Sequence, residues 1–318
     1  MDERGSSGSG ERARHRAARV AAGARELRLR LADEVRRGLA DPAAGRGWGE
    51  VAARMVDAQA PGLAARAREL PALTGEELLA GQALLDLLAA AWEQVDGLPG
   101  PLAATVRTRI GYTVTAAELL AGPTVRDRWL VLGSDERPQE RLVHRRSWLL
   151  GAKTGRTALL LDYARPGHPA APVLPLHTTL EAELAFHPAA VPLRAVLGPR
   201  YGEPEPAPPG PPPGCSLATA TARYGEAVAA DPWTESHPVV LAGALPLPGP
   251  HGWLLTDGQH ALPLHPQTSA TARWQLAAVC AGRPAAVFGE CGHRGFAPVT
   301  VWDESGEPVP LDPPGGLR

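Results

Sequence analysis

The sequence predicts an α+β fold, in which an N-terminal helical bundle is followed by β-rich antiparallel segments. Two observations predict it. From residue 11 to about residue 122, apolar residues recur at three- and four-residue spacing, which is typical of amphipathic helices. Beyond Val125, short apolar runs are separated by polar or glycine-containing turns, which is typical of antiparallel strands. A chain of 318 residues is long enough for two domains or one large one.

Composition divides the chain into six segments. These are a flexible lead at 1–10, a helical domain at 11–124, a β-rich segment at 125–203, a proline-rich spacer at 204–214, an α+β segment at 215–303 and a loose tail at 304–318. The spacer has seven prolines in eleven positions, which is typical of semi-rigid polyproline linkers.

The helical domain should contain four or five helices. The first is expected from Glu11 to about Ala40, where Gly38 and a following Asp-Pro pair end it. Two later helices begin with a threonine that is followed three residues later by a glutamate. These pairs are Thr74 with Glu77 and Thr115 with Glu118. Such a capping box satisfies free backbone N–H groups at a helix N-terminus.

The β-rich part begins with an expected antiparallel meander. Residues 151–155 (GAKTG) contain Gly, Lys and Thr, but not in the order that a phosphate-binding loop requires, so they predict a hairpin turn. Leu180–Phe186 alternates apolar and polar residues and predicts a strand. After the spacer, a helix is expected at about 218–230. Further β-structure is expected at Val239–Leu245, Trp253–Leu255, Trp274–Cys280, Ala285–Phe288 and Pro298–Trp302.

Global composition excludes several classes of protein. The formal net charge is −2, so nothing global indicates a polyanionic partner. The most apolar run, Ala83–Trp92, is too short to span a bilayer, and the first ten residues lack the apolar core of a secretory signal. Three cysteines are too few for a disulfide framework and favour a reducing compartment. We therefore expect a cytoplasmic protein that does not insert into a membrane.

Residues that carry chemistry are sparse. Cys291 and His293 are the only Cys and His at metal-ligand spacing, whereas a structural zinc needs four ligands, usually in two close pairs. The other cysteines, Cys215 and Cys280, stand alone in the sequence. We therefore expect no cofactor and no metal site, with Cys291 and His293 as the weak candidates for metal ligands.

Cys291 is also the one candidate nucleophile. Side chains at i and i+2 point the same way on a strand, so His293 could orient or deprotonate it. The ordinary explanation is a tight turn at Gly292 that packs Cys291 inward, since free cysteines are usually buried and inert. No G-x-S-x-G motif occurs, and the acids are scattered without a D-x-D ligand set. No catalytic residue is therefore assigned, and the chain is not expected to be an enzyme.

The first helix carries excess positive charge. Between residues 11 and 37 it has nine arginines against four acids, and a basic helix can follow a nucleic-acid backbone. No aromatic residue lies among these arginines to stack on bases. The chain also has only one lysine, Lys153, so arginine enrichment reflects composition as much as phosphate binding. Nucleic-acid binding through this helix remains an alternative to protein binding.

Five stretches resemble the SWIM zinc finger family proteins of actinobacteria, in the region that follows the finger. They are Met55–Ala64, Leu102–Leu132, Thr154–Leu160, Tyr224–Trp233 and Val287–Trp302. In that family the finger, C-x-C followed at a distance by C-x-H, supplies the zinc ligands. This chain has no C-x-C, so the resemblance implies a finger-less member and does not carry zinc binding over.

The resemblance also implies a bacterial setting in which such proteins are encoded near MoxR-type AAA ATPases and von Willebrand-type domain proteins. We therefore expect a non-enzymatic accessory or interaction protein that works beside a MoxR-type ATPase. Exposed tryptophans are frequent anchors in protein interfaces. Two of the eight tryptophans, Trp233 and Trp302, lie beside loops and are expected to be partly exposed.

Overall fold

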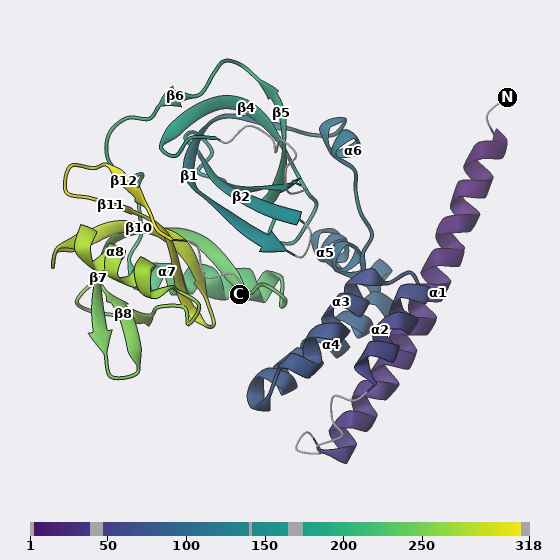
Figure 1. Ribbon diagram of the computed structural model, residues 1–318. Coiled ribbons are helices and arrows are strands. Elements are labelled where there is room, and N and C mark those ends of the chain that lie inside the picture. Colours follow the sequence, from purple (N-terminus) through teal and green to yellow (C-terminus); the bar gives the residue numbers. More distant parts are fainter. Residues whose placement is uncertain (1–2, 39–46, 140–141, 165–173, 313–318) are drawn as a thin grey trace. The chain divides into compact units, whose positions relative to one another are not determined.

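The computed structural model describes residues 3–38, 47–139, 142–164 and 174–312 (Figure 1). The chain forms two compact units. Unit 1 contains residues 1–113 and 188–190, and unit 2 contains residues 114–187 and 191–318. Helices come first and β-rich, mainly antiparallel sheets follow, so the predicted α+β class is confirmed.

Unit 1 is a helical bundle. Its helices are α1 (Glu3–Arg37), α2 (Trp48–Asp57), α3 (Pro61–Glu69), α4 (Gly75–Glu93) and α5 (Gly100–Ile110), with 3-10 turns at Leu70–Ala72 and Val95–Gly97. The predicted apolar stripe of α1 is buried, with Val20, Ala24 and Leu27 fully inaccessible. Residues 3–10 were predicted as a flexible lead, which is wrong, because they continue α1. An existing helix extends at low cost, since each added residue brings one more backbone hydrogen bond.

A glycine allows α3 and α5 to pack closely. A Cβ at Gly62 would overlap the carbonyl oxygen of Arg109 on α5. Only a residue without a side chain permits that approach. Trp92 of α4 stacks on Tyr112, with ring centroids 5.1 Å apart. The guanidinium of Arg16, a residue of α1, lies 3.8 Å from the centroid of the Tyr112 ring. These contacts join the first and last helices of the bundle.

The two predicted capping boxes have different outcomes. At α6 (Ala116–Leu120), Thr115 Oγ1 accepts a 3.2 Å bond from Glu118 N–H, and Glu118 accepts a 2.7 Å bond from Thr115 N–H, so this box is confirmed. At α4, Thr74 is the N-cap residue but its side chain makes no capping bond. The following Gly75 has φ 55°, a left-handed conformation that differs from the helical one required at that position.

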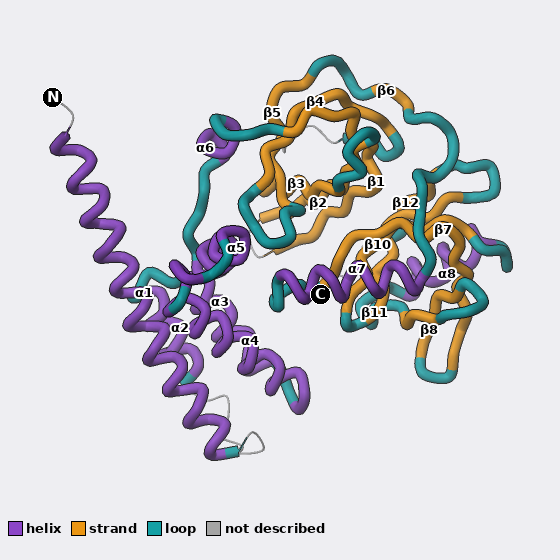
Figure 2. The backbone as a smooth tube through the Cα atoms, turned by 180° about the vertical axis from the view of Figure 1, so that it is seen from behind, coloured by secondary structure: helices purple, strands orange, loops and turns teal. Residues whose placement is uncertain are grey.

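The first half of unit 2 is a closed β-barrel. Its strands are β1 (Val125–Gln139), β2 (Leu142–Gly151), β3 (Thr157–Ala164), β4 (Thr178–Phe186) and β5 (Arg194–Arg200), followed by a short β6 (Glu205–Pro206). The order is β1-β2-β3-β5-β4, and β1 pairs again with β4 to close the ring, which Figure 2 shows. The β3–β5 pair is parallel and short, and the other neighbouring pairs are antiparallel.

This strand order, with a long β1 shared between two neighbours and a parallel β3–β5 contact, is that of the five-stranded OB-fold barrel. The barrel interior contains Trp129, Leu149, Leu160, Leu180 and Leu184. The predicted strand at 180–186 is therefore confirmed, with its apolar side inward. The predicted turn at 151–155 joins β2 to β3 and is also confirmed.

The second half of unit 2 is an antiparallel sheet. It contains β7 (Ser236–Gly249), β8 (Gly252–Thr256), β9 (Ala261–Pro263), β10 (Ala285–Gly292), β11 (Gly295–Trp302) and β12 (Pro308–Pro310), in the order β12-β11-β10-β7-β8-β9. Helices α7 (Leu217–Ala230) and α8 (Ala270–Cys280) pack on one face through Leu217, Ala272 and Leu276. The other face packs against the outside of the barrel.

That barrel–sheet contact is apolar and buried. Leu132 and Trp148 of the barrel meet Phe288, Val299 and Trp302 of the sheet, each at most 8% exposed. The register of β1 shifts between Val131 and Gly133. Gly133 permits the close approach because it has no side chain: a Cβ there would lie 2.6 Å from a Val299 methyl carbon. Thr300 Oγ1 also donates a 2.7 Å hydrogen bond to the Leu132 carbonyl. The outer face of β1 and β2 is thus largely covered within unit 2.

Two sequence predictions for this half are wrong. Residues 274–280 were predicted as a strand but form the C-terminal part of α8, which Ser269 caps; an apolar run of seven residues does not distinguish a helix from a strand. In the proline-rich stretch 204–214, Ala207 N–H bonds to His177 O and Gly210 N–H bonds to Gly306 O. The tail is ordered beyond residue 304, because β12 pairs with β11; residues 313–318 lie outside the described part.

Candidate functional site

Cys291 and His293 do not form a pair. Cys291 lies in β10 and is 2% exposed, whereas β10 ends at Gly292 and His293 lies in the exposed β10–β11 turn. The i, i+2 alignment expected on a strand therefore does not extend to His293. Its Nδ1 atom instead lies 3.4 Å from the Tyr224 hydroxyl. Burial raises the pKa of the Cys291 thiol, and nearby Cys215 adds to the effect. A thiol in this state is a poor nucleophile at neutral pH.

The imidazole that lies beside Cys291 belongs to His237. The two residues are directly opposite across the β7–β10 ladder, where side chains share one face of the sheet. Burial lowers the pKa of His237, and the charge of Arg223 lowers it further. Both groups are therefore neutral at pH 7, without the thiolate–imidazolium charge pair of an activated cysteine. Sequence spacing could not reveal this neighbour, because strand register brings it there.

All three cysteines belong to one apolar core in unit 2. Cys280 and Cys291 are buried among Leu241, Leu276 and Phe296, and Cys215 packs against the same cluster. Burial raises the pKa of Cys280 to about 11. Among the described residues, no three Cys, His, Asp or Glu side chains converge to hold a metal ion. The geometry gives these thiols a packing role.

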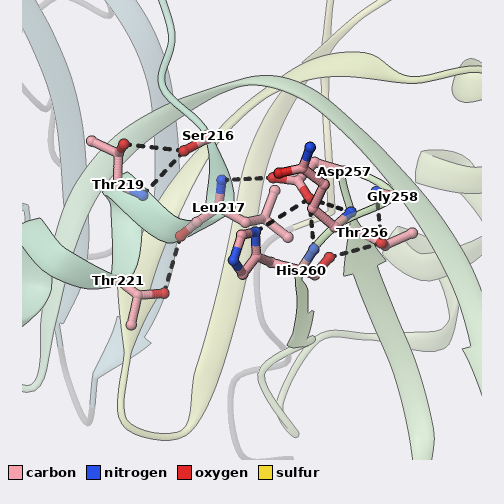
Figure 3. A network of polar contacts seen from close by, with 9 residues as sticks. Ser216, Leu217, Thr219, Thr221, Thr256, Asp257, Gly258 and His260 are labelled. Carbon is pink, nitrogen blue, oxygen red and sulfur yellow. Dashed lines mark hydrogen bonds and ion pairs between the residues drawn. The ribbon is translucent and has the colours of Figure 1, made fainter.

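Polar contacts at the N-terminus of α7 involve Ser216, Asp257 and His260 (Figure 3), in which Leu217 connects the helix start to Asp257. Asp257 accepts hydrogen bonds from the backbone N–H groups of Leu217 at 3.3 Å and His260 at 2.8 Å, and such backbone bonds hold its pKa below the usual value. Ser216 Oγ bonds to Thr219 and caps the helix. The arrangement therefore connects the β8–β9 turn to α7 and does not resemble a serine nucleophile with its base.

The β2–β3 turn is likewise held by a carboxylate. Asp127, which is 2% exposed, accepts bonds from the backbone N–H groups of Lys153 at 3.1 Å and Thr154 at 2.9 Å, and from the Thr154 hydroxyl at 2.7 Å. A phosphate loop would direct such N–H groups at its ligand. Here they are directed at the protein's own carboxylate, which agrees with the predicted hairpin turn.

Several arginines of α1 bind groups within unit 1. Arg28 pairs with Asp86 at 3.1 Å and Glu93 at 2.9 Å, Arg30 and Arg37 pair with Glu34 at 2.6 and 2.9 Å, and Arg36 pairs with Asp33 at 2.8 Å. Arg16 donates a 2.9 Å bond to the Gly111 carbonyl. Ion pairs within unit 1 therefore offset part of the positive charge that could bind a nucleic-acid backbone.

A buried ion cluster joins the barrel to the C-terminal sheet. Arg146 makes two contacts of 3.0 Å to Glu290 and lies 3.7 Å from Asp135, and these side chains are 14%, 11% and 6% exposed. Ser236 donates a 3.0 Å bond to Glu290. Burial by itself lowers the pKa of Arg146, but the two carboxylates reverse this and hold it above its usual value. The cluster is structural, since it fixes two halves of one unit.

Helix α4 has an exposed apolar face. Its inner side buries Leu85, Leu88 and Trp92. On the outer side, Leu79, Leu84 and Leu87 are 50%, 39% and 42% exposed, and Ala80 and Ala83 lie between them and are also exposed. We call these five residues the α4 face. Asp86 and Glu93 lie at its edge, where Arg28 binds both.

The α4 face is unusual for a helix that meets water. Helices that are apolar on all sides are normally buried, whereas surface helices carry polar residues on their outer face. The signal for this face in the sequence is that the positions of Leu78–Ala91 on both sides of the helix are nearly all apolar.

One of the two tryptophans expected to be partly exposed is so. Trp233 is partly exposed, as expected, whereas Trp302 is 2% exposed and lies in the barrel–sheet core. Trp274 of α8 is 66% exposed and makes an edge contact with Trp253, with ring centroids 5.1 Å apart. The exposure of Trp274 was not predicted because residues 274–280 were assigned to a strand. Residues on one side recur every 3.6 positions in a helix and every second position in a strand.

Comparison with known proteins identifies one region. Residues 15–110 match the family described as the SWIM-associated four-helix bundle domain. The match begins within α1 and ends with the last residue of α5, so it corresponds to the helical part of unit 1. No curated protein and no solved structure matches the chain. Among the described helices, none has both the length and the apolar character needed to cross a bilayer.

Proposed function

We propose that this chain is a non-enzymatic interaction protein, and that its helical unit binds a partner protein through the α4 face. The observation that carries the proposal is the exposure of three leucines on a helix whose outer side has no charged residue between Glu77 and Asp86. Exposed contiguous apolar surface rimmed by polar residues marks protein interaction sites. The residues that match the SWIM-associated four-helix bundle domain include this same helix.

The shape of the α4 face indicates what it binds. From Leu79 to Leu87 it extends about 12 Å along the helix, at the usual rise of 1.5 Å per residue. Leucines lie at both ends and the small side chain of Ala83 lies between them. A partner helix with apolar residues at matching spacing fits such a surface. The finer proposal, that the partner is a MoxR-type AAA ATPase, rests on the resemblance to SWIM proteins alone.

The proposal is tested by placing a charge in the α4 face. Ala83→Glu introduces a carboxylate into the centre of the apolar surface, and both alanine and glutamate are strong helix formers. The matched control is Ala53→Glu, at an exposed position of α2. Partner recovery from the native host should be retained by the wild type and by Ala53→Glu, and lost with Ala83→Glu at unchanged helical circular dichroism. Equal recovery by both variants would contradict the proposal.

The enzymatic alternative has weaker support. It requires Cys291 as a nucleophile, and that thiol is buried with a raised pKa. Rapid alkylation of Cys291 in the native chain at neutral pH would revive it.

A further inference from the structure

The barrel of unit 2 has a charged cleft beside its β2–β3 turn. The cleft is lined by Arg126, Asp127 and Arg128 of β1, by Ala152 and Lys153 of the turn, and by Glu181 of β4. Its volume of about 640 Å³ lies within the usual range of small-molecule sites, about 300–1,000 Å³. Three of the six lining residues are cations, so the ligand that suits this cleft is an anion.

Strand alternation directs two of these cations outward. Asp127 is 2% exposed, whereas its neighbours on β1, Arg126 and Arg128, are exposed. The Cα atoms of the two arginines are about 7 Å apart at the usual rise of a strand. The N–H group of Ala152 donates a 2.9 Å bond to the Arg128 carbonyl, and this bond places Lys153 beside the same stretch of β1. The three cations therefore come together from two separate segments of the chain.

The carboxylate of Asp127 is satisfied by the turn itself. The backbone N–H groups of Lys153 and Thr154 and the Thr154 hydroxyl donate to it. Burial alone raises the pKa of Asp127, but these bonds hold that pKa below its usual value. The backbone of the turn is therefore occupied, and the side chain of Lys153 remains for a ligand.

Arg126 is held in position by two contacts. Its Nε and Nη2 atoms donate to Glu181 Oε1 at 3.1 and 2.7 Å, and its guanidinium lies 3.8 Å from the Tyr201 ring centroid. An exposed ion pair contributes little to stability, but together with the aromatic ring it fixes the plane of the guanidinium. The third guanidinium nitrogen, Nη1, takes no part in the bonds to Glu181 and is left to donate to a ligand.

Arg128 and Lys153 are not neutralised by a contact. Within the part of the chain that the structure describes, neither side chain makes a hydrogen bond or an ion pair. Glu181 is the cross-strand partner of Arg128, but the side-chain bonds that its carboxylate accepts come from Arg126. Two uncommitted cations match a ligand group with two negative charges. A phosphate monoester carries a charge of about −1.5 to −2 at pH 7, and Arg and Lys are its usual partners.

We propose that this cleft binds a small molecule that carries a phosphate monoester, with the phosphate held between Arg128 and Lys153 and a further bond from Arg126. A phosphodiester carries one charge per phosphate and leaves one of the two cations unbalanced, so nucleic acid is not the expected ligand. OB-fold barrels bind oligonucleotides on the outer face of β2 and β3, whereas this cleft lies on the β1–β4 side. The site belongs to unit 2, so it does not rest on the α4 face.

The test is isothermal titration calorimetry of the full chain in a phosphate-free buffer of low ionic strength. Glycerol 3-phosphate, a small monoester, should bind saturably at one site per chain. Dimethyl phosphate, a diester with a single charge, should bind at least about tenfold more weakly, because a hydrogen bond to a charged group contributes about that factor. Inorganic phosphate should bind more weakly than the monoester, because it has no organic part to fill the rest of the cleft.

Two variants assign the site. Arg128→Gln and Lys153→Gln each remove one uncommitted cation from an exposed position and should weaken glycerol 3-phosphate binding about tenfold, with unchanged thermal melts. Arg223→Gln is the matched control, since it removes an exposed arginine of α7 in the same unit but outside the cleft, and it should bind like the wild type. Ala83→Glu in the α4 face should also leave this binding unchanged, so failure of this proposal and failure of the α4 proposal are distinguishable.

Three results would overturn the proposal. These are no saturable binding of glycerol 3-phosphate by the wild type, binding that Arg128→Gln and Lys153→Gln leave unchanged, and dimethyl phosphate bound as tightly as glycerol 3-phosphate. Inorganic phosphate bound more tightly than the monoester would also overturn it and would assign the cleft to the free anion.

Discussion

Removing one member of the Arg146 cluster should destabilise unit 2 strongly. Glu290→Ala deletes both 3.0 Å contacts to Arg146 and leaves the guanidinium with Asp135 at 3.7 Å. Because Arg146 is only 14% exposed, water does not replace the lost carboxylate. Breaking a buried ion pair from one side typically costs about 3–5 kcal/mol. Glu290→Gln keeps an acceptor for Ser236 and for Arg146, so it should cost less, about 1–3 kcal/mol.

The double variant Arg146→Met with Glu290→Leu makes the test specific. Arg146→Met alone and Glu290→Leu alone are the single variants of this cycle. If each loses stability because it leaves an uncompensated charge, the double variant should lose less stability than the sum of the two, by about 2 kcal/mol or more. Urea unfolding followed by tryptophan fluorescence measures these values, since Trp148 lies 5.4 Å from Arg146. Glu304→Gln, which breaks the exposed Arg283–Glu304 pair of the same unit, is the control and should show no measurable change. Additive losses, or a loss below about 1 kcal/mol for Glu290→Ala, would refute the reasoning.

Three further predictions follow from local geometry. Thr115→Ala should destabilise by about 1 kcal/mol because it removes a formed cap, whereas Thr74→Ala should have a smaller effect because no such bond exists there; equal losses in urea unfolding would contradict this. Gly62→Ala should lower the stability of unit 1 by about 1–3 kcal/mol or more, whereas Gly49→Ala, which meets open space, should be neutral or slightly stabilising; a tolerated Gly62→Ala in thermal melts would contradict the close approach. Burial raises the pKa of Cys280 from its ordinary value of 9.0 to about 11, so the folded state holds this proton more tightly than the unfolded state; stability should fall as pH rises from about 9 to about 11, less steeply in Cys280→Ala, and an identical pH dependence in that variant would refute the shift.

Local sequence signals predicted individual elements well. Apolar spacing identified the buried stripe of α1, and alternation identified β4 with its inward side. Thr115 and Glu118 predicted their cap because that box depends on four consecutive residues. Thr74 and Glu77 have the same residue types at the same spacing, but Gly75 between them has a left-handed backbone conformation, and the capping bond does not form. Short apolar runs were the least reliable signal for secondary structure, because a run such as residues 274–280 is compatible with a helix and with a strand.

The candidate sites were harder to predict because they depend on long-range pairing. His237 is beside Cys291, and Glu181 is beside Arg128, only through strand register. The parallel contact between β3 and β5, which defines the barrel, has no local signature in the sequence. The α4 face was visible as an excess of leucine and alanine, but spacing alone does not say which side of an apolar helix remains exposed.

Site-specific photo-crosslinking at position 83 tests the central claim most directly. A photoreactive amino acid replaces Ala83 in the middle of the α4 face, or Ala53 on the exposed side of α2 as the matched control, in the native host. Irradiation should join position 83 to one protein of defined mass and leave position 53 without that adduct, since a docked partner would lie within contact distance of the α4 face alone. No adduct from position 83, or the same adducts from both positions, would contradict the claim that this helix binds the partner.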